Sequence, residues 1–192
     1  SAVFLVAAVL KGGYILRKSG SHRSMQANQS RPRIKISITP LEVLLELVSL
    51  IGLAGAVWIL IKFWPDLPAA IPKHFGLTGE VDAWGDRSSL YFLLGVNLFM
   101  YVMLTIVRRF PHTYNYPVKI TADNAQRQYQ LAIWYMALLK AQVVWLFVYL
   151  QWQMIQVALG HSSGLGIWFL AIVLVGLFLP ILIYVLVARK NR

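Results

Sequence analysis

The sequence contains no cysteine and few charged residues. Cysteine is absent from all 192 positions, which excludes disulfides, thiolate metal sites and cysteine nucleophiles. Only 13% of the residues are charged, whereas a soluble domain usually has about a quarter. Among the charged residues the acidic ones are the fewer, with 7 Asp and Glu against 18 Lys and Arg. A glycine-rich phosphate loop and a His-Glu-x-x-His zinc helix are also absent, and we expect no Gly-x-Ser-x-Gly nucleophile elbow.

Hydrophobic residues dominate what is present. They make up 58% of the chain, and the mean hydropathy is +0.63. These values indicate that the main partner of the chain is a lipid bilayer. The net charge of +11 would suggest nucleic acid in a soluble protein. Because the basic residues are not interleaved with aromatic residues on one face, we expect no nucleic acid partner.

Four apolar segments are long enough to cross a bilayer. They are residues 41–63, 90–107, 131–157 and 167–188. The first begins with Thr39, Pro40 and Glu42, which predict a capped helix start. We therefore predict an all-α, integral membrane helical bundle over residues 41–188. The small residues Gly52, Ala54, Gly55 and Ala56 predict close contact of the first helix with a neighbour.

The N-terminal segment, residues 1–16, is hydrophobic but short. Its apolar run of nine residues rises only ~14 Å as a helix, about half of a bilayer core. Three interpretations stay open: a fifth membrane helix, an interfacial anchor and the remnant of a signal segment.

Residues 17–40 are expected to be a basic cytoplasmic linker. Residues 17–35 carry six cations and no acid, which predicts binding to anionic lipid. The same composition is typical of any cytoplasmic connection under the positive-inside rule, and the two interpretations are compatible.

The distribution of Lys and Arg predicts the topology. Residues 11–40 carry seven, 108–130 carry four and 189–192 carry three. The connections 62–88 and 158–166 carry only three between them. The positive-inside rule therefore places the C-terminus in the cytoplasm and the loop of residues 64–89 outside.

This outer loop is the candidate site for chemistry or binding. Its singled-out residues are Pro72, His74, Gly79, Glu80, Asp82, Trp84, Asp86 and Arg87. Imidazole and carboxylate ligands suit metal ions, with His74 and Asp82 the first candidates. The spacing matches no established metal signature. The alternative is structural, with carboxylates accepting backbone N–H bonds in turns and Asp86 pairing with Arg87 or Lys73.

Two ionisable residues lie inside predicted membrane spans, Glu46 and Lys140. Counted from the cytoplasmic ends of their helices, their depths differ by ~6 Å, which is within side-chain reach. We predict an ion pair that fixes helix packing. The alternative is a proton or ion path, as in a small transporter, with Asn97 as a further polar group.

Two motifs resemble a known family. The first is Ile-Pro-x-His-Phe at 71–75, followed by Gly-Glu-x-Asp-x-Trp-Gly-x-Arg at 79–87. The second begins at residue 115 and includes Asn115, Tyr116, Pro117, Thr121, Asn124 and Arg127. Together they resemble the bacterial membrane family called domain of unknown function 1648, over residues 64–130. The resemblance implies a small multi-span protein of the bacterial inner membrane, related to the N-terminal part of Sdp-type immunity proteins.

The family resemblance implies no reaction and no catalytic residues, and we predict none. We expect a non-catalytic membrane protein that binds a protein partner through its outer loop or helix surface. It would act as an accessory subunit of a membrane complex or as an immunity or sensory protein. The alternatives are a metal-dependent membrane enzyme that uses His74 and the acidic loop, and a small transporter. No cofactor is predicted, apart from the metal ion of the first alternative.

Overall fold

The computed structural model describes residues 31–192. The predictions for residues 1–16, and for most of the basic linker, lie outside the described residues. The helices are α2 (Pro40–Phe63), α3 (Ser89–Val107), α4 (Ala125–Ala158) and α5 (Phe169–Lys190), with short 3-10 turns at Trp64–Asp66 and Pro111–Thr113. The strands are β1 (Ala70–Phe75) and β2 (Val81–Asp86).

All four helices are long and apolar enough to cross a membrane, which confirms the predicted all-α membrane bundle. α4 is the longest at 34 residues and begins six residues before the predicted span. The extension 125–130 is polar, and it lies where residues 121–129 predict the start of a helix. Thr121 and Asn124 start it, because Thr121 N donates to Asn124 Oδ1 at 2.9 Å and Asn124 N donates to Thr121 Oγ1 at 3.4 Å.

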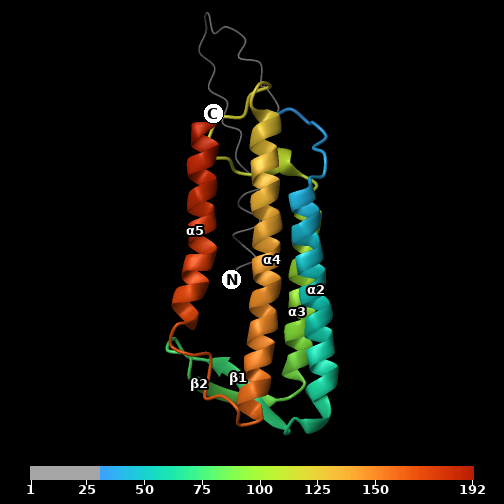
Figure 1. The fold of residues 1–192 in the computed structure, drawn as a ribbon, viewed down its shortest axis with the longest axis vertical. Coiled ribbons are helices and arrows are strands. Elements are labelled where there is room, and N and C mark those ends of the chain that lie inside the picture. Colours follow the sequence, from blue (N-terminus) through green and yellow to red (C-terminus); the bar gives the residue numbers. More distant parts are fainter. Residues whose placement is uncertain (1–30) are drawn as a thin grey trace, which may run out of the picture. The chain divides into compact units, whose positions relative to one another are not determined.

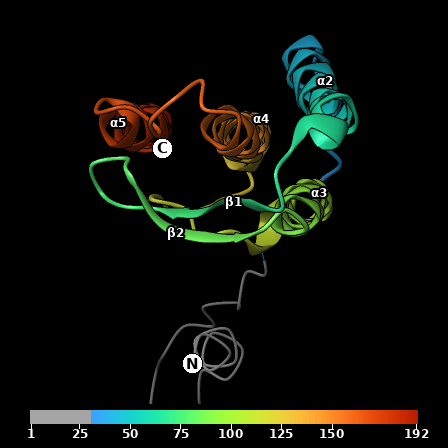
Figure 2. The ribbon, with the colours of Figure 1, turned by 90° about the horizontal axis from the view of Figure 1, so that it is seen from below.

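α4 is the central helix of the described bundle. It packs against α2, α3 and α5, and α5 packs mainly against α4. Figure 2 shows α4 between α5 on one side and the pair α2 and α3 on the other. Within the span of α5 no residue of the most apolar window is buried, against 39% for α4. The outward surface of α5 is therefore covered by lipid or by another protein chain.

The contact between α2 and α4 depends on small residues. Ser49, Gly52 and Ala56 are buried on the face of α2 toward α4. A Cβ atom on Gly52 would lie 2.8 Å from Val144 Cγ1. Gly55 has no atom within 4 Å of the equivalent position, so the close contact uses only part of the predicted small-residue face.

The loop of residues 64–89 contains a β-hairpin, which the sequence analysis did not predict. β1 and β2 pair antiparallel from Ala70 opposite Asp86 to Phe75 opposite Val81, with irregular register around His74. Side chains of β2 alternate between half-buried and exposed, as expected for a strand with one covered face. The prolines and glycines favoured an interpretation as turns, but the residues between them pair as strands. The hairpin lies at one end of the bundle, below α5 and beside the lower ends of α3 and α4 in Figure 1.

An apolar core joins the hairpin to the helix ends. Ile71 of β1 is fully buried and packs with Leu60, Leu90 and Ile155 from α2, α3 and α4. Burying an isoleucine side chain contributes about 2 kcal/mol. This contact fixes the hairpin on three helices. We call this end of the bundle the hairpin end, and the end that holds residues 108–124 and 188–192 the basic end.

Candidate functional site

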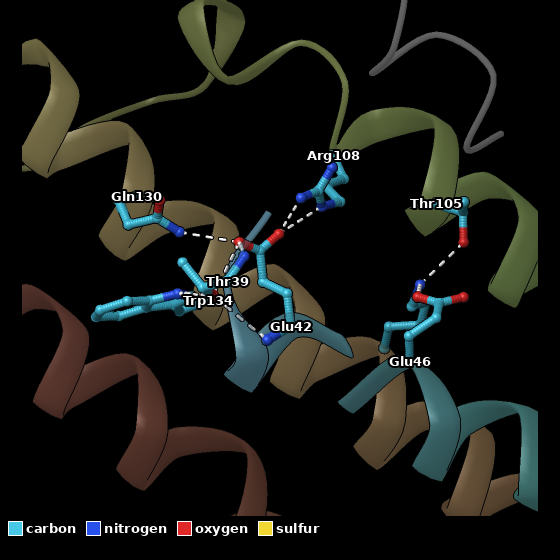
Figure 3. A network of polar contacts seen from close by, with 8 residues as sticks. Thr39, Glu42, Glu46, Thr105, Arg108, Gln130 and Trp134 are labelled. Carbon is cyan, nitrogen blue, oxygen red and sulfur yellow. Dashed lines mark hydrogen bonds and ion pairs between the residues drawn. The ribbon is translucent and has the colours of Figure 1, made fainter. Parts of the chain in front are cut away.

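Two ion pairs lie between the helices in the half of the bundle nearer the basic end (Figure 3). In the pair nearer the basic end, the guanidinium of Arg108 at the end of α3 binds the carboxylate of Glu42. Arg108 Nε lies 2.8 Å from Glu42 Oε2. Glu42 is only 4% exposed. Gln130 Nε2 of α4 donates to the same carboxylate at 3.0 Å, and the capping box with Thr39 predicted from sequence is present.

The other ion pair, which lies deeper in the bundle, joins Glu46 of α2 to Lys140 of α4. Lys140 is 3% exposed, and its ammonium also donates to Thr105 Oγ1 of α3 at 3.0 Å. The Tyr101 hydroxyl donates to Glu46, and the Lys140 Nζ atom lies 4.8 Å from the Tyr101 ring centroid. Side chains of α2, α3 and α4 therefore share one set of polar contacts.

Sequence reasoning missed Arg108 and Tyr101 as members of this network. Arg108 follows the second span directly and Glu42 begins the first, so both lie at the same end of neighbouring helices. Their similar depth along the helices could have predicted this ion pair. Tyr101 gave no signal, because a single tyrosine in an apolar segment does not predict a polar partner.

Asn97, the further polar group of the transporter hypothesis, does not join the pair. Its Nδ2 atom donates to the Val144 carbonyl at 3.4 Å, one helical turn beyond Lys140. Its Oδ1 atom is buried and has no hydrogen-bond partner among the described residues. Further toward the hairpin end, Gln151 Nε2 donates to the Ala56 carbonyl at 2.7 Å. The Asn97 amide therefore joins α3 to α4, and the Gln151 amide joins α4 to α2 nearer the hairpin end.

On the hairpin, the two strands bring His74 and Asp82 together. His74 Nδ1 lies 2.6 Å from Asp82 Oδ1, and the two side chains are 69% and 46% exposed. Within residues 31–192, no group of three or more His, Asp or Glu side chains is arranged to hold a metal ion. Any metal bound here would therefore have at most two protein ligands from the described residues.

Asp86 and Arg87 act within the hairpin's connection to α3. Asp86 Oδ1 accepts a hydrogen bond from Ser88 N at 2.7 Å, and hydrogen bonding from Ser88 lowers the pKa of Asp86. The expected pairing of Asp86 with Arg87 or Lys73 is absent from the ion pairs of the described chain. Arg87 instead lies over the Trp64 ring, 4.8 Å from its centroid, because the indole face attracts the guanidinium.

The tip of the hairpin is attached to the connection between α4 and α5. Leu165 N donates to the Gly79 carbonyl at 2.8 Å, and Glu80 forms a bridge with Gly164. Gly79 has a φ of +87°, and a Cβ atom on Gly164 would overlap the Gly79 carbonyl. Both glycines are therefore required where the two backbones meet.

The same connection contains the letters Gly-x-Ser-x-Gly at residues 160–164, although the sequence analysis expected no nucleophile elbow. A nucleophile elbow needs this pattern between a strand and a helix. Here it follows helix α4, and Ser162 Oγ donates to the Gly164 carbonyl at 3.0 Å. The serine is therefore part of a turn, without the geometry of an elbow.

Comparison with protein families agrees with the first motif. Residues 50–98 match the family model described as Domain of unknown function (DUF1648). We call residues 50–98 the DUF1648 segment, after the family that they resemble. No curated protein and no solved structure matches the chain. The DUF1648 segment comprises most of α2, the whole hairpin and the first half of α3.

The second motif lies beyond the DUF1648 segment, at the basic end. Tyr116 stacks on Tyr114 with 6.2 Å between ring centroids, and its hydroxyl donates to the Pro111 carbonyl at 2.8 Å. Burial raises the pKa of Tyr114 to about 12 and raises that of Tyr116 as well. Arg31, assigned from sequence to lipid binding, donates to the His112 and Tyr114 carbonyls, so it has protein partners instead.

The remaining residues of this motif shape the walls of two hollows at the basic end. They are Asn115, Pro117, Thr121, Asn124 and Arg127. The structure therefore separates the predicted site residues into three groups: the hairpin, the intramembrane pair and the basic end.

Proposed function

We propose that this chain is a non-catalytic, multi-span protein of the bacterial inner membrane that binds a protein partner through its hairpin. The hairpin faces outward and the C-terminus lies in the cytoplasm. The scarcity of Lys and Arg at the hairpin end supports this orientation. The partner is a subunit of a membrane complex, or a secreted peptide in an immunity or sensory role.

The observation that carries the proposal is a rigid hairpin with an exposed outer surface. Ile71 fixes its base on three helices, and the Gly79–Leu165 hydrogen bond fixes its tip. On the opposite surface Trp84 is 56% exposed and His74 is exposed. A preorganised surface loses little conformational entropy on binding, and tryptophan is enriched among residues that dominate binding energy.

The interior supports a binding role. The two ion pairs and the amide contacts are internal to the bundle and hold together the helices that carry the hairpin. The transporter and metal-enzyme hypotheses have weaker support, since Asn97 does not reach the ion pair and His74 has one carboxylate neighbour.

The test is purification of the tagged chain from its native membrane in a gentle detergent, with mass spectrometry and elemental analysis of the same peak. We expect a stoichiometric protein partner that is lost in Trp84→Ala. Trp58→Ala is the matched control, because Trp58 is equally exposed, at 58%, but lies on α2.

Two results would contradict the proposal. Retention of the partner by Trp84→Ala, with loss in Trp58→Ala, would place binding on the helix surface. A lone protein with about one bound metal ion, lost on His74→Ala, would move the function to metal chemistry in the hairpin.

A further inference from the structure

A large cavity lies at the basic end, opposite the hairpin. Its volume is about 1120 Å³. Its walls come from the connection before α4, the first turn of α4 and the last residues of α5, which lie close together at the upper end in Figure 1. Segments more than sixty residues apart in sequence therefore form one hollow, in a region that the proposed function does not use.

The lining of this cavity is strongly basic. It includes five cations, Lys119, Arg127, Arg189, Lys190 and Arg192, and one acid, Asp123. Within residues 31–192 none of the five forms an ion pair. Residues 1–30 contain no Asp or Glu that could neutralise them. The five cations outnumber the one acid, so the lining has a net positive charge, which attracts anions.

Hydrogen bonds fix the walls of the cavity relative to each other. Gln128 of α4 is fully buried, and its Nε2 atom donates to the carbonyls of Ala188 and Asn191 at 2.9 and 3.0 Å. Arg127 Nη1 donates to Asn191 Oδ1 at 3.0 Å. The start of α4 and the end of α5 are thus joined, so the cations on both segments are held around one space.

An apolar groove begins next to the cavity. Pro117 lines both hollows. The groove has a volume of about 420 Å³ and runs between α4 and α5, where Ala132, Met136, Ile181 and Val185 line it. Ile181 and Val185 lie about two turns and one turn before Arg189 on α5. Ala132 and Met136 lie about one and a half and two and a half turns after Arg127 on α4. The groove therefore leads from the cavity into the membrane-spanning part of the bundle.

We propose that the basic cavity binds the phosphate of an anionic phospholipid, whose acyl chain lies in the apolar groove. Arginine guanidinium groups bind phosphate oxygens bidentately, and basic pockets at the ends of membrane helices suit anionic headgroups. A lipid fits both hollows at once, whereas a soluble phosphate compound would use the cavity alone. This site is separate from residues 17–35 and goes beyond the proposed partner binding.

The test is isothermal titration of the purified full-length chain in nonionic detergent with three short-chain probes. Dioctanoyl phosphatidylglycerol has both headgroup charge and acyl chains, dioctanoyl phosphatidylcholine has no net charge, and glycerol 3-phosphate has no chains. We expect saturable binding of phosphatidylglycerol, at least about tenfold tighter than that of the other two.

Variants locate the site. Lys119→Gln with Lys190→Gln removes two cavity cations whose side chains make no hydrogen bond within the described residues, so folding is spared. We expect binding to weaken about tenfold or more. Lys73→Gln with Arg109→Gln removes the same charge from exposed positions outside both the cavity and residues 17–35, and it should change binding less than about threefold.

Each other outcome overturns the inference. Equal weakening by the two double variants would mean that only general surface charge attracts the lipid. Equal affinity for phosphatidylcholine would exclude charge recognition. Binding of glycerol 3-phosphate as tight as that of phosphatidylglycerol would assign the cavity to a soluble phosphate compound.

Discussion

Lys140 of α4 forms an ion pair with Glu46 of α2, and the lysine is far more buried than its partner. The exposed fractions of the two side chains are 3% and 36%. Removing either charge leaves the other unpaired, but the cost depends on how buried the remaining group is. The difference in burial therefore predicts which of the two substitutions destabilises the protein more.

We predict that Glu46→Gln destabilises the protein more than Lys140→Gln. The first variant leaves a buried ammonium without its carboxylate and should cost about 3 kcal/mol. The second leaves a partly exposed carboxylate that still accepts the Tyr101 hydroxyl, and it should cost about 1–2 kcal/mol. Unfolding in detergent, followed by tryptophan fluorescence, measures both. Unchanged stability of both variants would exclude a packing role for the pair.

The contact between Glu46 and Lys140 could be predicted from the sequence. Helices of known direction give each residue a depth, and two opposite charges at similar depth predict a contact. The same reasoning applied to Glu42 and Arg108 would have found the second pair. The four spans followed from apolar length alone, since nothing except a helix satisfies its own backbone in lipid.

Features that depend on the meeting of distant segments could not be predicted. The hairpin was missed because its prolines and glycines resemble those of turns, and its pairing is irregular at His74. The attachment of Gly79 to Leu165 joins two loops separated by two helices. The basic cavity needs the end of α5 beside the start of α4, which no local pattern specifies.

A second prediction concerns two glycines of α2 that are three residues apart. Gly52→Ala should destabilise the protein by about 1–3 kcal/mol, because the new methyl group would lie 2.8 Å from the buried Val144 side chain. Gly55→Ala is the matched control. It has open space around its Cβ position and should be neutral or stabilising by up to about 1 kcal/mol. Equal effects of the two substitutions would contradict the close α2–α4 contact.

A third prediction tests the attachment of the hairpin tip. Gly164→Ala should separate the tip from the α4–α5 connection, since the methyl group would overlap the Gly79 carbonyl. Hydrogen exchange at Leu165 N should then become at least tenfold faster. A tenfold change corresponds to a loss of about 1.4 kcal/mol in the free energy of local opening. Gly95→Ala, with open space on α3, serves as control. Unchanged exchange in Gly164→Ala would show that the attachment does not hold the tip.

A fourth prediction follows from the lowered pKa of Asp86. A carboxyl whose pKa in the folded state lies below its unfolded value of about 3.9 stabilises the protein above that pH. The contribution is lost as pH falls through the folded-state pKa. Asp86→Asn should therefore lower the unfolding temperature at neutral pH, and the difference should shrink as pH falls below the ordinary pKa of an aspartate.

The control for the acid titration is Asp123→Asn at the basic end. Its carboxylate accepts no hydrogen bond within the described residues, so its removal should shift the unfolding temperature less at neutral pH. A difference between Asp86→Asn and the wild type that persists unchanged in acid would show that charge at this position is not what stabilises the start of α3.

The most direct test of the central claim is the side of the membrane on which the hairpin lies. The absence of cysteine allows single cysteines to be labelled without background. In intact bacterial cells, a membrane-impermeant maleimide should label Trp84→Cys at once and label Arg109→Cys only after the membrane is permeabilised. Labelling of Arg109→Cys but not of Trp84→Cys in intact cells would place the hairpin in the cytoplasm and contradict an outward binding surface.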